Sequence, residues 1–156
     1  MEIIYLSGGI EIIERIRDLW HELNTHHASV SKYFASHFNS FTFDTRIASL
    51  KKKAKDGEVF LFIAVDKSST KEIGYCISSV DSQMQGEIDS IFIQPDYMSK
   101  GIARELLNHA LEWFNANQVN DISIGVAYGN EETFKFYAKF GFLPKVTILQ
   151  KKSDNN

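Results

Sequence analysis

The sequence predicts an α/β protein with a mixed sheet, antiparallel in its first part and parallel in its second. A continuous apolar run, Val59 to Val65, is followed by a short polar turn and a second strand pattern, Glu72 to Val80. Two apolar runs joined in this way are typical of an antiparallel hairpin. From Glu87 onward, strand and helix patterns alternate, which favours parallel pairing with helices packed on the sheet.

The first 58 residues are predicted to be mostly helical. A short strand over residues 3–6 is followed by an amphipathic helix over about residues 10–24, where apolar side chains recur at helical spacing. The aromatic-rich segment 26–43 has weak periodicity and is interpreted as a short helix or a packed loop. Asp44 is expected to cap a second helix.

The second half of the chain is predicted to continue with strands and helices in alternation. Pro95 ends the strand that begins at Glu87, because proline cannot donate a hydrogen bond to a ladder. We expect one domain over residues 1–150 and a polar tail over 151–156. The elements expected after Pro95 are a helix over about 100–116, a strand over 122–126, a helix over about 131–140 and a last strand over 142–150.

Composition excludes several classes of protein. The chain has 156 residues, with 17 Lys and Arg against 20 Asp and Glu, and a net charge of −3. A nucleic-acid-binding protein usually carries a basic excess, so no nucleic-acid partner is expected. The single cysteine, Cys76, excludes an intramolecular disulfide framework and a cysteine-based zinc site. No metal is expected.

The chain carries no recognisable targeting or membrane-spanning pattern. Its first five residues lack a basic region followed by a long apolar region, and no apolar run approaches 18 residues. The lone cysteine also fits a reducing compartment. We therefore expect a cytoplasmic protein with no membrane partner.

The turn over residues 98–104 joins a strand to a helix and has the composition of an anion site. Backbone N–H groups at a helix N-terminus, together with the helix dipole, favour a bound anion. Gly101 lets a ligand approach the backbone closely, and Lys100 and Arg104 add positive charge. The alternative is an ordinary β–α turn that contains a glycine.

Two segments of the chain resemble motifs of the GNAT superfamily of N-acetyltransferases, which use acetyl-coenzyme A. The first is Met98-Ser99-Lys100-Gly101-Ile102-Ala103, which follows a strand and opens a helix. The second runs from Asn130 through Tyr137 to Gly141-Phe142. The two motifs in this order are much more specific than either alone, and the resemblance covers residues 59–142.

The resemblance implies a fold, a cosubstrate and a set of binding residues. The sheet is expected to splay between its fourth and fifth strands and to seat the pantetheine arm of acetyl-coenzyme A there. One departure is Met98, which stands where the family usually has Arg or Gln and cannot balance a phosphate charge. The expected binding residues are Ile91, Phe92 and Ile93 through their backbone, Ser99, Lys100, Gly101, Ile102, Ala103 and Arg104 at the turn, and Asn130 and Tyr137.

Three residues are candidates for catalysis. Glu87 and Asp89 are two apart on one strand, so their side chains point to the same face, and a carboxylate there can take a proton from the attacking amine. The alternative is a half-exposed pair that only attracts a cationic substrate. The resemblance suggests Tyr137 as the group that protonates the leaving thiolate; the alternative is a core tyrosine at the rim. Asn130 can also act as a simple N-cap.

The remaining polar and aromatic candidates are expected to be structural. Cys76 is interpreted as a small core residue, and the histidines at positions 21, 26 and 27 lack the spacing of a helical metal site. The run Lys51 to Lys55 is interpreted as a solvated helix face. The aromatic residues Tyr33, Phe34, Phe38, Phe41 and Phe43 fit either core packing or a wall of the acceptor pocket.

The sequence therefore predicts an enzyme that transfers acetyl from acetyl-coenzyme A to a primary amine by direct attack. The acceptor, a small-molecule or peptide amine, is not identified by the sequence. The alternative is a non-catalytic coenzyme-A-binding module that acts as a sensor or scaffold, which Met98 would favour. The resemblance is also compatible with a homodimer, in which residues Val146 to Gln150 pair across subunits.

Overall fold

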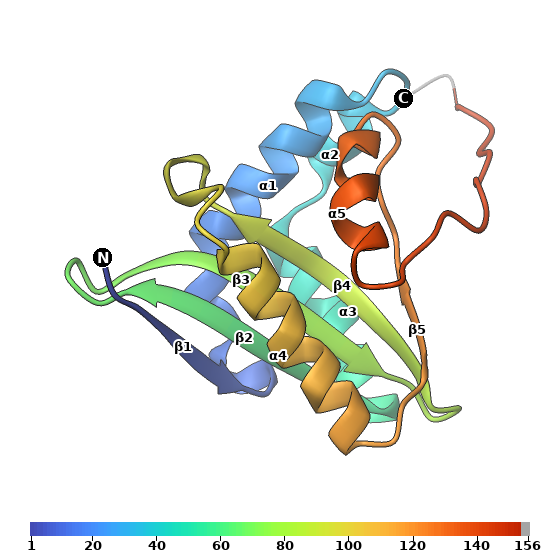
Figure 1. The fold of residues 1–156 in the computed structure, drawn as a ribbon. Helices are drawn as coiled ribbons and strands as arrows, with labels where there is room; N and C mark the ends of the chain where they lie inside the picture. Colours follow the sequence, from blue (N-terminus) through green and yellow to red (C-terminus); the bar gives the residue numbers. More distant parts are fainter. Residues whose placement is uncertain (154–156) are drawn as a thin grey trace.

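A five-stranded sheet forms the centre of the computed structural model, which describes residues 1–153 (Figure 1). The strands follow one another across the sheet in chain order. The first four strands pair antiparallel, and the fourth and fifth pair parallel, which confirms the predicted mixed sheet. The strands are β1 (Ile3–Gly8), β2 (Glu58–Asp66), β3 (Lys71–Val80), β4 (Gln85–Ile93) and β5 (Asp121–Ile124).

Helices cover both faces of the sheet. The helices α1 and α3 lie on one face and α4 crosses the other, while α5 lies beside the end of the sheet where β5 runs (Figure 1). The α-helices are α1 (Arg17–Val30), α2 (Ala35–Ser40), α3 (Phe43–Asp56), α4 (Ile102–Ala116) and α5 (Phe134–Ala138), and the 3-10 helices are Ile10–Ile16, Pro95–Tyr97 and Glu131–Thr133.

Burial on both faces explains why β2 reads as a continuous apolar run. Leu61, Ile63 and Val65 belong to the core beneath α1 and α3, whereas Phe62 and Ala64 belong to the core beneath α4. Successive side chains of a strand point to opposite faces, so a strand between two helical layers needs apolar residues at every position. The centre of the sheet is therefore buried on both faces, and polar side chains are left to the ends of the strands.

The sheet splays between β4 and β5, as the resemblance implied. Their parallel pairing runs only from Gln85 to Ile88 on β4. The register between β3 and β4 also shifts at this point, where Ile88 and Ser90 pair with consecutive residues of β3 and Asp89 is left over as a bulge. A bulge bends its strand and increases the local twist. The backbone of residues 89–93 consequently has an unpaired edge on the side toward β5.

Two predictions for the N-terminal half are corrected. The helix expected over residues 10–24 begins as the 3-10 helix Ile10–Ile16 and continues as α1 to Val30. Thr42, rather than Asp44, caps α3, because the backbone N–H of Thr45 donates to Thr42 Oγ1 at 3.1 Å. Asp44 lies in the first turn, where it receives a hydrogen bond from Arg17.

Predictions for the C-terminal part also need correction. The last strand expected over residues 142–150 is wrong, because residues 142–153 have no regular secondary structure. A strand needs a neighbour that accepts and donates its backbone hydrogen bonds, and this segment has none. The strand expected over 122–126 is shorter and begins one residue earlier, as β5 (Asp121–Ile124). The helix expected over 131–140 is a 3-10 turn followed by the short helix α5. The end of the predicted polar tail, 154–156, lies outside the described residues.

Candidate active site

The N-terminus of α4 has the geometry expected of an anion site. Gly101 precedes the helix with φ of 80°, a left-handed conformation that favours glycine, and no side chain caps the helix. A Cβ added at Gly101 would meet no atom within 4 Å, so the space in front of the turn is open. The first amides of a helix, here those of residues 102–104, have no intrahelical partner. They can therefore donate to a phosphate group.

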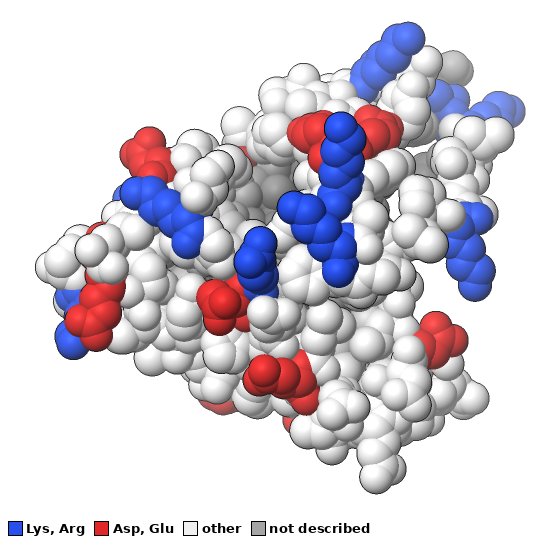
Figure 2. Space-filling model, in the orientation of Figure 1, with Lys and Arg blue, Asp and Glu red and all other residues white. Residues whose placement is uncertain are grey.

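Basic side chains surround this turn. Lys100 and Arg104 are exposed, and Arg104 also lines a cavity of about 230 Å³ together with Lys139 from the end of α5. Figure 2 shows basic side chains gathered along this part of the surface, next to a hollow. Lys139 was not predicted as a site residue, because its approach to α4 depends on how two helices pack. Met98 is 51% exposed and adds no charge.

Replacing Gly101 by alanine is expected to weaken coenzyme A binding at least about tenfold, because the new methyl group enters the space in front of the free amides. The left-handed backbone also costs about 1–2 kcal/mol of stability for any L residue. Gly141→Ala is the matched control, since Gly141 has φ of 86° and equally open surroundings. Calorimetric titration should show loss of affinity in Gly101→Ala alone. Equal affinities in the two folded variants would contradict the site.

The predicted carboxylates Glu87 and Asp89 do converge, and they converge on a lysine. Lys53 Nζ from α3 contacts Glu87 Oε2 and Asp89 Oδ1. The Asp89 side chain is only 1% exposed, whereas that of Glu87 is 45% exposed. Asp89 also offers the backbone oxygen that its bulge leaves unpaired, which accepts a hydrogen bond from Arg46 Nη2 at 2.9 Å. Asp89 is therefore a buried structural group, and Glu87 is the carboxylate that a ligand can reach.

Burial and pairing act against each other in this cluster. Burial raises the pKa of Asp89, and the hydrogen bond from Lys53 opposes that rise. Burial on its own lowers the pKa of Lys53, but hydrogen bonds to Asp89 and Glu87 raise it overall. The run Lys51 to Lys55 was predicted to form a solvated helix face, and that prediction is wrong for Lys53. Its spacing of three from buried Leu50 would have placed it at the edge of the inner face.

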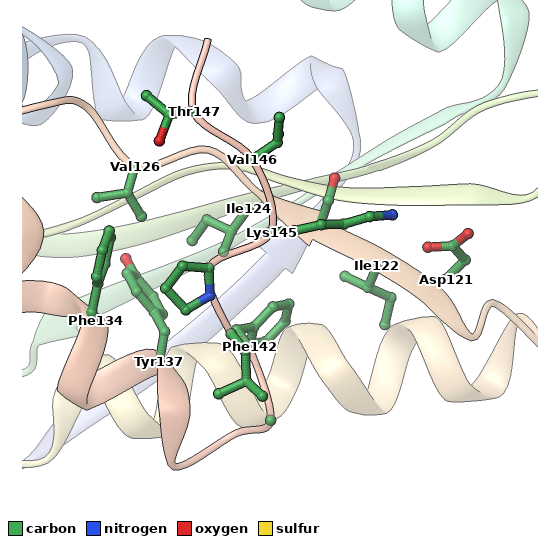
Figure 3. Close-up of a pocket in the computed structure, with 14 residues that line it drawn as sticks. Asp121, Ile122, Ile124, Val126, Phe134, Tyr137, Phe142, Lys145, Val146 and Thr147 are labelled. Atoms are coloured by element: carbon green, nitrogen blue, oxygen red, sulfur yellow. The ribbon is translucent and has the colours of Figure 1, made fainter.

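Tyr137 lies on α5 and lines a cavity of about 800 Å³, which β5 and residues 141–147 also line (Figure 3). Its hydroxyl has no hydrogen-bond partner among residues 1–153. Burial raises the pKa of Tyr137 to about 12, with a further contribution from Cys76. Because Cys76 pairs with Ile91 across β3 and β4, the Tyr137 hydroxyl belongs to the region of the open β4 edge.

Asn130 does not act as the side-chain cap that was considered for it. No side-chain hydrogen bond caps the 3-10 helix that follows Asn130. Its Oδ1 instead lies 3.3 Å from Nε2 of His26 on α1. Gly129, with φ of 102°, makes this contact possible, because a Cβ there would lie 2.3 Å from the backbone oxygen of Val30. The loop before α5 is thus held against the end of α1.

The aromatic cluster divides between core and surface. Phe43 is fully buried and Phe41 packs against the same core, so these two residues are structural. Tyr33 is exposed and stacks on Tyr128 with ring centroids 5.9 Å apart. This exposed aromatic pair lies beside the contact of Asn130 with α1 and forms a candidate wall for an acceptor.

The other polar candidates belong to the core or its margin. Cys76 is fully buried, and burial raises the pKa of its thiol to about 12, as a core residue requires. His27 packs against Phe38, and burial lowers its pKa. Within residues 1–153, no helix is both long enough and apolar enough to cross a bilayer.

Comparison with known proteins adds a family and a set of similar folds. The sequence pattern of the Acetyltransferase (GNAT) family matches residues 14–142. A curated relative, an uncharacterised N-acetyltransferase of Methanocaldococcus jannaschii, is 29% identical over 72 residues, which are 46% of this chain and 32% of that protein. The match therefore spans about a third of the length of the relative.

Solved structures share the fold at low sequence identity. The PaiA N-acetyltransferase of Thermoplasma acidophilum, solved with coenzyme A, superposes with a TM-score of 0.73 at 18% identity, covering 95% of this chain and 94% of that one. An aminoglycoside N-acetyltransferase, solved with a bisubstrate analogue of coenzyme A and acetylneamine, gives a TM-score of 0.66 at 16% identity, covering 98% of this chain and 100% of that one.

Proposed function

The chain belongs to the GNAT acetyltransferase family, and we propose that it is an acetyl-coenzyme A-dependent N-acetyltransferase that acts on a primary amine. The observation that carries this proposal is the unpaired edge of β4 beside the open helix N-terminus of α4. The backbone of Ile91 to Ile93 can pair with the amide-bearing pantetheine arm as an added strand would. The amides of residues 99–104 can bind the pyrophosphate.

The residues of the site fit the cosubstrate in charge and in shape. Lys100, Arg104 and Lys139 offer cations for its phosphates, and the space before Gly101 is open to them. Asn130 supplies an amide for a polar contact to the pantetheine. Met98 contributes no cation, so binding relies on the amides and on these neighbouring basic side chains.

Transfer needs a neutral amine, because an ammonium has no lone pair. In the proposed mechanism the amine nitrogen attacks the thioester carbonyl, the C–N bond forms, and the C–S bond breaks. Glu87 accepts the amine proton through water at Oε1, since the ion pair with Lys53 engages its Oε2. Asp89, buried beneath the same lysine, holds Lys53 in position. Tyr137 hydrogen-bonds or protonates the departing thiolate.

Glu87→Gln is expected to lower kcat/KM most below pH 7, where little of the amine is neutral, and to leave stability nearly unchanged because Asp89 still pairs with Lys53. A fall of about 10²-fold is the lower range for loss of a general base. Glu112→Gln, which removes an exposed charge on α4, is the matched control. A pH–rate profile that overlays the parent's would show that the amine's own equilibrium supplies the neutral form.

The second candidate is a non-catalytic coenzyme-A-binding module, which the missing cation at Met98 favours. Incubating the protein with acetyl-coenzyme A and a panel of amines, while following free thiol, separates the two functions. We expect thiol release that depends on an amine. Calorimetric binding of coenzyme A without thiol release on any amine would establish the module instead.

We further propose a small cationic amine as acceptor. The net charge of −3 favours the approach of a cation. The exposed, stacked pair of Tyr33 and Tyr128 can hold an ammonium by cation–π attraction. Polyamines and aminoglycoside-like amines belong in the panel, beside amino acids and lysine peptides.

The organisation of the protein completes the proposal. We propose one acetyltransferase domain over residues 1–150, a cytoplasmic location and a homodimer. The buried free thiol of Cys76 supports a reducing compartment. The exposed apolar side chains of Val146, Ile148 and Leu149 support the homodimer.

A further inference from the structure

The turn over residues 98–104 contains two residues in the left-handed conformation. Ser99 has φ of 62° and Gly101 has φ of 80°. Glycine adopts such a φ at no steric cost, but a serine remains there only where the surrounding structure holds it. The turn therefore needs support from outside itself if it is to present its amides in a fixed arrangement.

Backbone hydrogen bonds provide that support only as far as the first residue of the turn. The N–H of Gln94 donates to the oxygen of Ile73 at 2.8 Å, and the N–H groups of Tyr97 and Met98 donate to the oxygens of Gln94 and Pro95 at 2.9 and 3.2 Å. Among residues 1–153, the N–H groups of residues 99–101 donate to no backbone oxygen. These amides are free for a ligand, but they do not hold the turn in place.

The side chain of Tyr97 connects the start of the turn to another part of the sheet. Its hydroxyl donates to Asp66 Oδ2 at 2.9 Å, across 31 positions of the sequence. Asp66 is the last residue of β2 and is only 6% exposed. Tyr97 is itself the last residue of the 3-10 helix Pro95–Tyr97, directly before Met98. The hydrogen bond therefore holds the start of the turn against the hairpin between β2 and β3.

The Asp66 carboxylate is arranged to accept this hydrogen bond. Its Oδ1 accepts from the backbone N–H of Ser68 at 2.9 Å and from Ser68 Oγ at 2.7 Å, which leaves Oδ2 for the tyrosine. The hydrogen bonds from Ser68, and then the one from Tyr97, lower the pKa of Asp66 to about 2. The hydrogen bond to Asp66 raises the pKa of Tyr97. The carboxylate thus stays ionised and the phenol stays protonated, and a hydrogen bond to an ionised group is stronger than a neutral one.

The Tyr97 ring also contacts a cation of the turn. Lys100 Nζ lies 5.9 Å from the ring centroid, which is within the distance of about 6 Å at which cation–π attraction acts. Lys100 is one of the basic side chains that can approach a bound phosphate, and Met98 in the same turn supplies no charge. Tyr97 therefore holds both the backbone of the turn and one of its charges.

We propose that Tyr97 is a positioning residue for acetyl-coenzyme A. Its hydroxyl holds the pyrophosphate-binding turn against Asp66, and its ring orients Lys100 beside that turn. This role rests on the proposed function, because it assumes that the turn binds the cosubstrate. Tyr97 acts through the turn and not on the reacting atoms, so its loss should weaken cosubstrate binding and leave the chemical step unchanged.

Tyr97→Phe tests the hydroxyl, because phenylalanine keeps the ring. The Kd of coenzyme A from calorimetric titration and the KM of acetyl-coenzyme A are expected to rise about tenfold, an effect typical for loss of a hydrogen bond to a charged group. With the amine of the panel that releases most thiol, kcat should stay within about twofold of the parental value, because the reacting groups are unchanged. The titration requires no acceptor, so it decides the question even in an inactive protein.

Ser68→Ala is the matched control for Tyr97→Phe. It removes a 2.7 Å hydrogen bond to the same carboxylate and leaves the bond from Tyr97 in place, so its coenzyme A affinity should be parental. A parental affinity in Tyr97→Phe, or an equal loss in Ser68→Ala, would overturn the proposal, since the second result means that any loosening of the hairpin weakens binding. A parent that does not bind coenzyme A would instead refute the proposed function, and the role of Tyr97 with it.

The role of the ring is tested by combining variants. Tyr97→Leu removes both the ring and the hydroxyl, and thermal melting verifies that it folds. Residues in contact have non-additive effects, so Lys100→Ala should weaken coenzyme A binding about threefold more in the Tyr97→Phe background than in the Tyr97→Leu background. An equal effect of Lys100→Ala in the two backgrounds would overturn the role of the ring.

Discussion

Lys53→Met is expected to lower the free energy of unfolding by about 3 kcal/mol at neutral pH. Removing one partner of a buried ion pair typically costs about 3–5 kcal/mol, because the other charge stays buried. The Asp89 carboxylate is 1% exposed and would lose the ammonium that neutralises it. Lys53 itself is 36% exposed, so solvent screens part of its charge and places the effect at the lower end of the range.

The loss of stability in Lys53→Met should shrink as the pH falls. Burial already raises the pKa of Asp89 above its ordinary value of 3.8, and the variant loses Lys53, the largest of the groups that oppose that rise. The folded variant then binds a proton more tightly than the unfolded chain, so its stability increases as the pH drops through the raised pKa of Asp89. The deficit relative to the parent should therefore be largest at pH 8 and smaller at pH 5.

Urea denaturation of both proteins between pH 5 and pH 8 measures this difference. Lys52→Met is the matched control, because Lys52 precedes Lys53 on α3 and is exposed; it should change stability by less than about 0.5 kcal/mol. A Lys53→Met variant as stable as the control, or a deficit that does not vary with pH, would mean that the carboxylates are adequately solvated without the lysine.

The sequence predicted the centre of the fold because local pattern and tertiary environment agree there. The apolar run of β2 requires burial on both faces, and the two helical layers provide it. Gly101 was predicted to be a site residue because a ligand there must approach the backbone closely. The structure gives Gly101 a positive φ, which glycine adopts at no steric cost, and leaves the space around it open. The same agreement between pattern and environment explains why β4, its end before Pro95, and α4 were predicted.

Features that depend on contacts between distant segments could not be predicted in the same way. The bulge at Asp89 appears only in the register between β3 and β4, and the lysine that joins Glu87 to Asp89 comes from α3. Thr42 caps α3 although Asp44 has an equally suitable side chain, because the position of the first helical turn decides between them. Residues 142–150 have strand composition but no neighbour, and composition alone does not supply one.

Tyr137→Phe is expected to lower kcat by at least about tenfold, while coenzyme A affinity and stability change little. The raised pKa of about 12 keeps the phenol protonated throughout the working pH range. A thiol of pKa about 8.5 is a stronger acid than this phenol, so complete proton transfer to the thiolate is uphill. Hydrogen-bond donation to the developing thiolate is then the larger part of the effect, because an unpaired anion in a partly dry cavity is costly.

The proposed role of Tyr137 needs the hydroxyl and not the ring, so phenylalanine is the right substitution. The Tyr137 ring packs against Phe136 and Phe142, and Phe retains those contacts. Loss of a general acid typically costs about 10²–10⁴ in rate; loss of hydrogen-bond donation alone should cost less. Tyr5→Phe, which removes a phenolic hydroxyl from β1 at the opposite edge of the sheet, is the matched control and should keep the parental kcat. Single-turnover measurements, in which chemistry limits the rate, distinguish the two variants.

Parental single-turnover rates in Tyr137→Phe would return Tyr137 to the role of a packing residue at the rim of the cavity. The leaving thiolate would then have to be stabilised by solvent or by backbone amides of the open β4 edge.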